Sequence, residues 1–287
     1  MVEHLRGAGH DVLRLVRHTP PSGPGHGSDL EWNPVAGRLP IDAIDGVDAV
    51  INLSGAGIGD HRWTDSYRAE LRSSRIVTTQ LLASTIAAAA RPPSVLLSGS
   101  AVGWYGARGD EILDEQSSPG SGFLADLCAD WEAATAPAVS AGVRTVHLRT
   151  GIVLTPRGGA LKKQLPLFKL GLGGRFGSGR QWQSWISLDD EVGAIEHLLT
   201  SSLAGAVNLT APVPVTNREF GHTLGSVLKR PSVLPIPAFG PKLLLGADVA
   251  NTLLFTGQRV VPSRLLDDGY SFTYSTLDAA LRGLLER

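Results

Sequence analysis

Short, almost continuous apolar runs alternate with helical patterns along the first half of the chain, and this alternation constrains the fold most. Runs of apolar and β-branched residues bounded by glycine, proline and serine are typical of strands that are buried on both faces. The predicted strands span residues 12–16, 48–55, 93–100 and 144–154, and the predicted helices span residues 64–90 and 121–142. Strands that alternate with helices indicate a parallel sheet with helices on both faces. The predicted fold class is therefore α/β, a doubly wound parallel sheet.

After about residue 155 the alternation becomes less regular. Glycine-rich loop sequence comes first, and helical patterns return at residues 216–230, at residues 242–255 and at the C-terminus. An open α/β sheet binds ligands at the carboxyl ends of its strands, and a lobe built over that edge would face the ligand. We predict an α/β domain over residues 1–155 and a smaller C-terminal substrate lobe over residues 156–287.

Composition and charge exclude several classes of function. The formal net charge is -1 and 18% of the residues are charged, so no charge excess favours nucleic acid or an anionic membrane. Cys128 is the single cysteine, which excludes an internal disulfide, and the histidines form no cluster at metal-ligand spacing. No apolar run is long enough to span a membrane, and the first residues lack the apolar core of a secretory signal. We expect a cytoplasmic protein with a small-molecule substrate.

A nucleotide-binding sheet usually carries a glycine-rich turn after its first strand, and three glycine clusters are candidates for it. GPGHG at residues 23–27 follows no strand that leads into a helix, and GLGGRFGSG at residues 171–179 has glycines at the wrong offsets. GAGIG at residues 55–59 does follow a strand. Its third glycine comes one residue early, however, and the polar sequence DHR follows where a helix must pack closely. GAGIG therefore stays open as an alternative phosphate loop.

The start of the chain provides a better interpretation. MVEHLRGAGHDVLRLVR has the pattern of a helix end, a glycine turn and a short buried strand that ends at Arg17. This order resembles the first helix and second strand of a Rossmann unit, so the first strand and its glycine turn would belong ahead of Met1, over roughly 15 residues. That strand is central in the order 3-2-1-4-5, and its two neighbours would lose hydrogen-bond partners. We expect the chain as written to fold poorly or to bind its cofactor weakly.

Arg17 also bears on the choice of cofactor. An acidic residue at the end of the second strand binds the ribose 2′-hydroxyl of NAD, whereas an arginine there accommodates the 2′-phosphate of NADP. The next acidic residue after Arg17 is Asp29. Arg17 is therefore a candidate cofactor-binding residue and NADP(H) is favoured over NAD(H), the alternative being a solvated arginine at a strand end.

Motifs along the whole chain carry a family resemblance. They are RWTDSYRAELRSSRIVTT, SGSAVGWYG, FLADLCADWE, LRTGIVLTPRGGAL, GLGGRFGSGRQWQSWISLDD, NLTAPVPVTNREF and GQRVVPSRLLDDGYSFTY. Together they resemble the extended short-chain dehydrogenase/reductase superfamily, and more closely its atypical epimerase-family branch, which is nucleoside-diphosphate-sugar epimerase-like. The resemblance implies a Rossmann fold, a bound NAD(P), and oxidoreductase or isomerase chemistry.

The same resemblance implies a Tyr-x-x-x-Lys pair, in which the lysine cation lowers the pKa of a tyrosine on the same helix face. At the corresponding place this sequence has Phe123 and Leu127, and none of its four tyrosines is followed by lysine at the required spacing. The candidate catalytic residues are Ser100, at the end of a strand, and Tyr105, in the W-Y-G turn. Each has a structural alternative, Ser100 as a turn cap and Tyr105 as a packing residue. The acidic loop at residues 114–115 offers a carboxylate base or is merely solvated.

The resemblance also implies positions for the cofactor and the substrate. The cofactor-binding candidates besides Arg17 are Leu53, Ser54, Gly55, Arg75, Gly151 and Ile152. A glycine-rich flap follows them, and its substrate-binding candidates are Arg180, Gln181 and Trp185. Asp189 and Asp190 are predicted to cap the next helix.

Two functions from different classes follow. The first is an NADP(H)-binding epimerase or oxidoreductase that acts on a small polar or sugar-like substrate with unusual proton donors. The second is a non-catalytic NADP(H)-binding sensor or scaffold, which the loss of both members of Tyr-x-x-x-Lys favours. The long helix predicted at residues 64–90 offers a surface for a homodimer.

Overall fold

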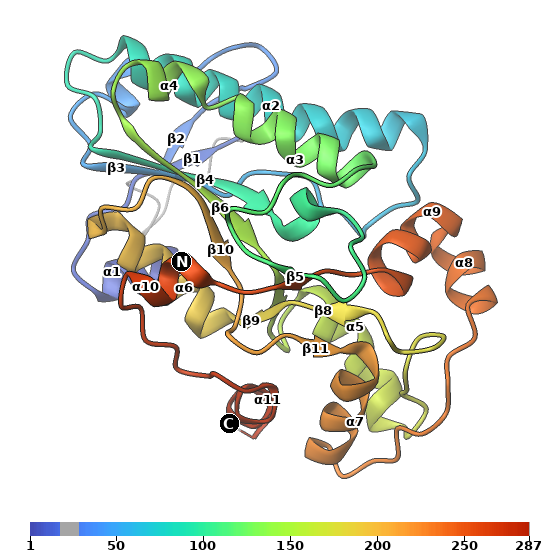
Figure 1. Cartoon of the computed structure of the whole chain (residues 1–287). Coiled ribbons are helices and arrows are strands. Elements are labelled where there is room, and N and C mark those ends of the chain that lie inside the picture. The colour runs from blue at the N-terminus through green and yellow to red at the C-terminus, as the bar shows by residue number, and fades with distance from the viewer. Residues whose placement is uncertain (18–28, 287) are drawn as a thin grey trace.

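A parallel β-sheet with helices on both faces forms the centre of the molecule (Figure 1). The computed structural model describes residues 1–17 and 29–286, and the predicted loop at residues 23–27 lies outside the described residues. The main sheet has the order β10–β6–β4–β3, and all of its neighbouring strands are parallel. Its strands are β3 (Ala49–Asn52), β4 (Val95–Ala101), β6 (Arg144–Thr150) and β10 (Gly205–Leu209). The predicted α/β class is confirmed.

The central strands are apolar along most of their length because both of their faces are buried. Val95 and Leu97 of β4 are fully buried in one apolar cluster, and Leu96 between them is fully buried in a cluster on the opposite face. Successive side chains of a strand point to opposite faces, so a doubly covered strand needs apolar residues at each position. This burial on both faces explains why apolar runs in the sequence correctly predicted the positions of the strands.

Two sets of helices cover the two faces of the sheet. One face carries α2 (Asp65–Ala88), α3 (Phe123–Ala133) and α4 (Ala136–Ser140), and the other carries α1 (Val2–Gly7), α6 (Leu188–Thr200) and α10 (Ser263–Asp267) (Figure 1). The hydroxyl of Thr64 caps α2 by accepting from the N–H of Tyr67, so this helix begins where predicted. The prediction that Asp189 and Asp190 cap α6 was wrong. Ser187 precedes both Asp189 and Asp190, and its hydroxyl accepts from the N–H of Asp190.

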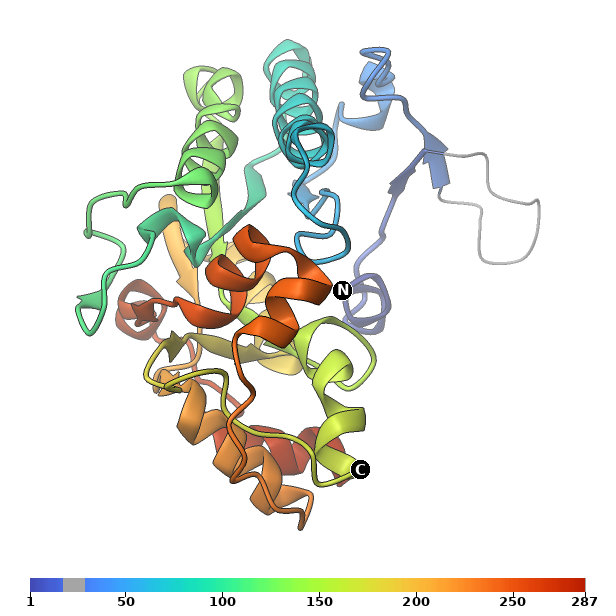
Figure 2. The same cartoon turned by 90° about the vertical axis from the view of Figure 1, so that its right-hand side faces the viewer.

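A second, two-stranded parallel sheet stands apart from the main one. It consists of β1 (Arg14–Val16) and β2 (Asp29–Glu31). Within the described residues β1 pairs only with β2, and β3 pairs only with β4. Figure 2 shows the β1–β2 pair separated from the other strands, on the side of β3. Arg17 follows β1 directly and is exposed.

A lobe begins at the carboxyl end of β6 and has its own apolar core, which includes Trp185, Phe168 and Phe220. Its elements are β7 (Ile152–Leu154), α5 (Gly159–Lys169), β8 (Trp182–Gln183), β9 (Trp185–Ser187), β11 (Val215–Thr216), α7 (Asn217–Val227) and α11 (Leu277–Leu285). Strand β7 pairs with β9, and β8 pairs with β11. The predicted boundary at residue 155 differs from the structure, because α6 and β10 lie beyond it and yet pack on and extend the main sheet.

The remaining elements are short and lie outside the main sheet. They are the 3₁₀ helices η1 (Ile41–Ala43) and η2 (Val102–Tyr105), strands β5 (Ile112–Leu113) and β12 (Arg259–Val260), helices α8 (Phe239–Leu245) and α9 (Ala247–Ala250), and the π-helical turn η3 (Asn251–Phe255). Strand β5 pairs with β12, which ties the chain after β4 to the C-terminal region. Among the described residues, no helix is long and apolar enough to cross a membrane, and no group of side chains forms a metal site.

Candidate functional site

The end of β4 carries Ser100, whose hydroxyl donates to a buried carboxylate. Ser100 Oγ lies 2.7 Å from Oε1 of Glu132, which projects from α3. Arg149 is the register partner of Ser100 on β6, and its guanidinium donates to both oxygens of Glu132, from Nε at 2.8 Å and from Nη2 at 2.9 Å. All three side chains are buried, Glu132 being 8% exposed. A carboxylate in such a place needs a paired cation and further donors to stay charged.

Tyr105 extends this network towards β10. Its hydroxyl donates to Oδ1 of Asn208 at 2.7 Å and accepts from Nη1 of Arg149 at 3.2 Å. Asn208 donates in turn from Nδ2 to the carbonyl of Val261 at 3.0 Å. The Arg149 guanidinium carbon also lies 3.9 Å from the centroid of the Trp104 ring. Burial raises the pKa of Tyr105, so its phenol stays protonated at neutral pH.

The network changes the roles expected of both candidate catalytic residues. Tyr105 is 0% exposed, and its hydroxyl is already engaged as donor and as acceptor. The structure therefore gives Tyr105 the packing role and contradicts its role as a proton donor to a substrate. Ser100 is 5% exposed and directs its proton to Glu132, which leaves the Oγ lone pairs for a ligand. Ser100 remains the candidate that can contact a substrate.

The two positions predicted to lack the acid–base pair lie on α3, beside a second apolar pair on a neighbouring face of that helix. Phe123 and Leu127 pack in the apolar cluster beside α2. Leu124 and Cys128 point towards η2 instead, because a Cβ at Gly103 would lie 3.2 Å from Leu124 Cβ and 3.6 Å from Cys128 Sγ. Burial raises the pKa of the Cys128 thiol to about 12, so the thiol is neutral. Neither pair of residues supplies an acid or a base.

Leu53, Ser54 and Gly55 follow the carboxyl end of β3, as predicted for residues that approach a cofactor. Leu53 is 51% exposed, and the backbone N–H of Ser54 donates to Oδ1 of Asn52 at 3.2 Å. Asn52 is itself held by a hydrogen bond from Nδ2 to the Thr79 hydroxyl at 2.9 Å. The loop thus begins from a fixed polar anchor and keeps its backbone near the surface.

Arg75 of α2 lies underneath this loop. Its Nη2 donates to the carbonyl of Ala56 at 2.9 Å, and a Cβ at Gly55 would lie 3.0 Å from its Cζ. The guanidinium also stacks on Trp131, with Cζ 5.1 Å from the ring centroid. Burial lowers the pKa of Arg75. These contacts show that Arg75 supports the loop.

The GAGIG segment bends around a carboxylate. A Cβ at Gly57 would lie 1.8 Å from Oδ2 of Asp60, so the acidic side chain occupies the space beside this glycine. The Tyr67 hydroxyl donates to the Gly57 carbonyl at 2.5 Å and holds the turn on α2. A carboxylate in this position repels a phosphate group. The geometry therefore argues against GAGIG as a pyrophosphate loop.

Gly151 and Ile152 lie where the sheet meets the lobe. The N–H of Gly151 donates to the carbonyl of Leu209 at 3.0 Å, and that of Ile152 donates to the carbonyl of Ser184 at 2.8 Å. A Cβ at Gly151 would lie 2.4 Å from the Ser184 carbonyl oxygen. Glycine is thus required here for close backbone packing, and the backbone amides of both residues are already used.

The predicted flap residues separate into three environments. Arg180 is exposed. Gln181 donates from Nε2 to the carbonyls of Phe176 at 3.1 Å and Leu254 at 2.6 Å, so it ties the flap to η3. Trp185 is 0% exposed, lies in the core of the lobe and donates to the Val213 carbonyl at 3.0 Å. The prediction of Trp185 as a substrate-binding residue was wrong, because its ring is enclosed by apolar side chains.

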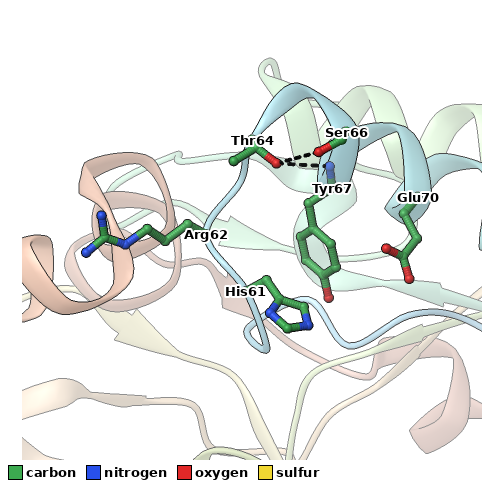
Figure 3. A pocket seen from close by; sticks show the side chains of 6 residues that line it. All are labelled: His61, Arg62, Thr64, Ser66, Tyr67 and Glu70. Carbon is green, nitrogen blue, oxygen red and sulfur yellow. Dashed lines mark hydrogen bonds between the residues drawn. The ribbon is translucent and has the colours of Figure 1, made fainter.

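Two hollows lie near these residues. A cavity of about 750 Å³ separates β1 from β3 and reaches Leu53 and Ser54. A smaller, open hollow of about 320 Å³ lies at the start of α2 (Figure 3). Its side chains are His61, Arg62, Thr64, Ser66, Tyr67 and Glu70. The larger cavity therefore adjoins the predicted cofactor residues, whereas the smaller one is a surface feature.

Comparison with known proteins decides the family. The NAD dependent epimerase/dehydratase family matches residues 1–209. The chain belongs to this family. A domain of unknown function, DUF1731, matches residues 236–284 of this family member, which include α8, α9, η3, β12, α10 and most of α11. The resemblance to the epimerase-family branch is confirmed.

Relatives of this epimerase-family chain match nearly its whole length. An epimerase family protein of Mycobacterium tuberculosis is 45% identical over 278 residues, which cover 96% of this chain and 90% of the relative. The crystal structure of human epimerase family protein SDR39U1 with NADPH superposes with a TM-score of 0.90 at 34% identity, covering 99% of this chain and 94% of the other. A nucleoside-diphosphate sugar epimerase from Corynebacterium glutamicum gives a TM-score of 0.76 at 35% identity, covering 98% of this chain and 54% of the other.

The sequence did not reveal the buried network of this family member. Neither Glu132 nor Asn208 was predicted as a site residue from the sequence. The sequence carries little signal for this pair, because α3 also contains Asp126 and Asp130 and β6 also contains Arg144 and His147. Which of these polar side chains are buried and paired is decided only when α3 packs on the sheet.

Glu191 of this epimerase-family chain gives stability a dependence on pH. It is 7% exposed, accepts one hydrogen bond from the Thr150 hydroxyl at 2.9 Å, and has a buried Oε2 without a partner. Burial raises its pKa from 4.5 to about 8. The native state thus holds the proton more tightly than the unfolded chain between these values. The stabilisation is complete below pH 4.5 and is lost as the pH rises towards 8.

We expect Glu191→Gln to remove this pH dependence. Wild type should lose stability between about pH 5.5 and about pH 8.5, and the variant should lose less, because its amide cannot ionise. Urea unfolding at both pH values measures the difference. Glu3→Gln, which changes an exposed glutamate of α1, is the control and should follow the wild type. Identical pH slopes for wild type and Glu191→Gln would contradict the prediction.

Proposed function

We propose that this chain is an NADP(H)-binding epimerase-like or oxidoreductase-like protein that acts on a small polar or sugar-like substrate. The observation that carries the proposal is the likeness over the whole chain to a human relative solved with NADPH. An arginine at the end of β1 supports the phosphorylated cofactor, since an arginine there accommodates a 2′-phosphate. When bound, the nicotinamide would accept or donate a hydride.

Two strand ends offer groups that would hold the adenosine half of such a cofactor. Arg17 is exposed one residue beyond β1, and Leu53 and Ser54 lie at the carboxyl end of β3 beside the cavity. These two strand ends would hold the ribose and its phosphate. Ser100 would lie on the substrate side, with its Oγ oriented by Glu132. Arg75 would keep the loop after β3 in place from below.

Replacing Arg17 by glutamate tests the choice of cofactor. We expect Arg17→Glu to weaken NADPH binding by about tenfold or more, since a charge-assisted hydrogen bond contributes about 1.5–3 kcal/mol. Binding of NADH should change little. Titration of NADPH fluorescence with each protein measures both affinities. Arg38→Glu changes an exposed arginine of the same region and is the control. Equal loss of NADPH and NADH affinity would contradict the proposed contact.

A second function, a non-catalytic NADP(H)-binding sensor or scaffold, is favoured by one observation. The buried Tyr105 and the α3 residues Leu124 and Cys128 leave no acid or base of the superfamily's kind next to Ser100. A protein that only binds NADP(H) needs no such group. The two functions agree on the cofactor and differ in turnover.

Turnover with a panel of carbonyl substrates separates the two functions. If the chain is an enzyme, Ser100→Ala should lower kcat by at least about tenfold, because it removes the oriented Oγ. Ser98→Ala is the matched control, since Ser98 lies on the same strand and its buried hydroxyl has no partner. NADPH oxidation followed by absorbance provides the rate. NADPH binding without turnover of any panel member would favour the sensor.

A further inference from the structure

Exposed apolar side chains gather on one side of the molecule, in the lobe and in α8. Among the described residues, seven large apolar side chains are at least 60% exposed. Six of these seven come from the turn after α5, from residues 230–238 and from α8: Leu170, Val233, Leu234, Phe239, Leu243 and Leu244. We call these six side chains the apolar face. Exposed apolar side chains normally occur singly, whereas a cluster of them marks an interaction site.

Backbone contacts hold the segments that carry the apolar face side by side. Nε of Arg230 donates to the carbonyl of Lys169 at 3.0 Å, and the N–H of Ile236 donates to the carbonyl of Arg175 at 2.8 Å. Helix α8 follows this segment directly. Both lie at the right-hand edge of Figure 1, which is the side that faces the viewer in Figure 2. The apolar face therefore runs from the end of α5 along residues 230–238 to α8.

The segments that carry the apolar face are strongly basic, although the net charge of the whole chain is only -1. Residues 156–187 contain six basic residues and no acidic one, and residues 201–246 contain four basic residues and a single acidic one, Glu219. Lys169 directly precedes Leu170, and Lys242 directly precedes Leu243. The small net charge of the chain thus hides a local positive surface, and such a surface attracts an anionic partner.

We infer that the apolar face is a docking surface for a lipid bilayer with anionic headgroups. Phe239 and Leu243 are four residues apart, so they lie on the same side of α8. They would insert at the boundary between headgroups and acyl chains, while the neighbouring lysines would attract the anionic headgroups. This inference concerns a surface that the proposed function does not use, and it is independent of that function.

Shape and charge favour a bilayer over two other occupants. Side chains that are at least 60% exposed project from the surface, whereas a docked peptide needs a groove or pockets that enclose its anchors. A second copy of the chain in a symmetric contact would place this positive surface against itself, and like charges across an interface repel each other. An anionic bilayer needs no matching shape and supplies the opposite charge.

Flotation of the full chain with lipid vesicles, without any nucleotide, tests the inference. Vesicles of phosphatidylcholine alone are compared with vesicles of equal parts phosphatidylcholine and phosphatidylglycerol, at low and at high salt. The variant Leu243→Ser/Leu244→Ser removes two apolar side chains from the exposed surface of α8. The variant Lys169→Gln/Lys229→Gln removes two exposed positive charges.

Each variant has a matched control outside the apolar face. Val35→Ser/Val139→Ser removes two other exposed apolar side chains, and Arg38→Gln/Arg91→Gln removes two other exposed positive charges. The thermal midpoint of each protein shows that it is folded. Because all the substituted side chains are exposed, each midpoint should stay close to that of the wild type.

We expect the wild type to bind the anionic vesicles and to bind the neutral ones at least about tenfold more weakly, since each basic residue at an anionic surface contributes about fivefold in affinity. Both variants should weaken binding by about tenfold or more, and the controls should bind like the wild type. High salt should release the protein from the vesicles.

Three results would overturn the inference. They are absence of binding to the anionic vesicles, equal binding by the wild type and either variant, and a wild-type dimer in sedimentation equilibrium that Leu243→Ser/Leu244→Ser dissociates. In the last case a second copy of the chain covers the apolar face. Because NADPH takes no part in these measurements, their outcome does not depend on the proposed cofactor.

Discussion

Arg149→Met is expected to destabilise the protein by about 3–5 kcal/mol, because it leaves Glu132 buried without its cation. In the native state Arg149 donates to both oxygens of Glu132 and to the Tyr105 hydroxyl. The methionine side chain fills part of the space but donates no hydrogen bond. Urea unfolding, with the free energy of unfolding extrapolated to zero urea, measures the effect.

The double variant Glu132→Leu/Arg149→Met separates pairing from packing. Removing both charges leaves no unpaired buried ion, so the double variant should be less destabilised than the sum of the single variants. The surface pair of Arg282 and Asp278 provides the control, since both side chains are about half exposed. Arg282→Met should change stability by less than about 1 kcal/mol. Additive effects at Glu132 and Arg149 would contradict the pairing.

Trp185→Ala is expected to destabilise the protein by about 3–5 kcal/mol through the cavity that it leaves in the lobe. Trp185 is fully buried among Leu154, Phe168 and other apolar side chains, and its indole N–H donates to the carbonyl of Val213. Alanine removes both the apolar contacts and the donor. The free energy of unfolding from urea titration again provides the value.

Trp182 is the matched control for this substitution. It lies three residues earlier, is only partly buried, and donates from its indole to Oδ1 of Asp110 at 2.7 Å. Trp182→Ala should therefore have the smaller effect, since less apolar surface returns to water. A stable Trp185→Ala protein that had lost only ligand affinity would support the earlier substrate role instead.

Much of the fold followed from local patterns. The predicted strand at residues 93–100 corresponds to β4, Val95–Ala101, and the helix predicted at residues 64–90 corresponds to α2, Asp65–Ala88. Both rest on interactions within a short segment, namely double-sided burial and the Thr64 cap. Such features leave a sequence signal because neighbouring residues determine them.

The candidate site was less predictable, because burial and pairing there depend on residues far apart in the chain. Ser100, Glu132 and Arg149 come from β4, α3 and β6, and they meet only when the sheet has formed. Two tryptophans of one flap, Trp182 and Trp185, look equivalent in sequence. The pairing of β7 with β9 turns only Trp185 into the core.

The amino-acid sequence by itself therefore determined the order of strands and helices, since apolar periodicity decides which segments can be buried on one face or on two. Tertiary structure alone decided which polar groups are still available to a ligand. The Tyr105 hydroxyl already donates to Asn208 and accepts from Arg149. The Ser100 hydroxyl donates to Glu132, and its oxygen can still accept a hydrogen bond from a ligand. The reason is physical: a hydrogen-bonding group is free or occupied according to its neighbours in space, and those neighbours are set by the packing of distant segments.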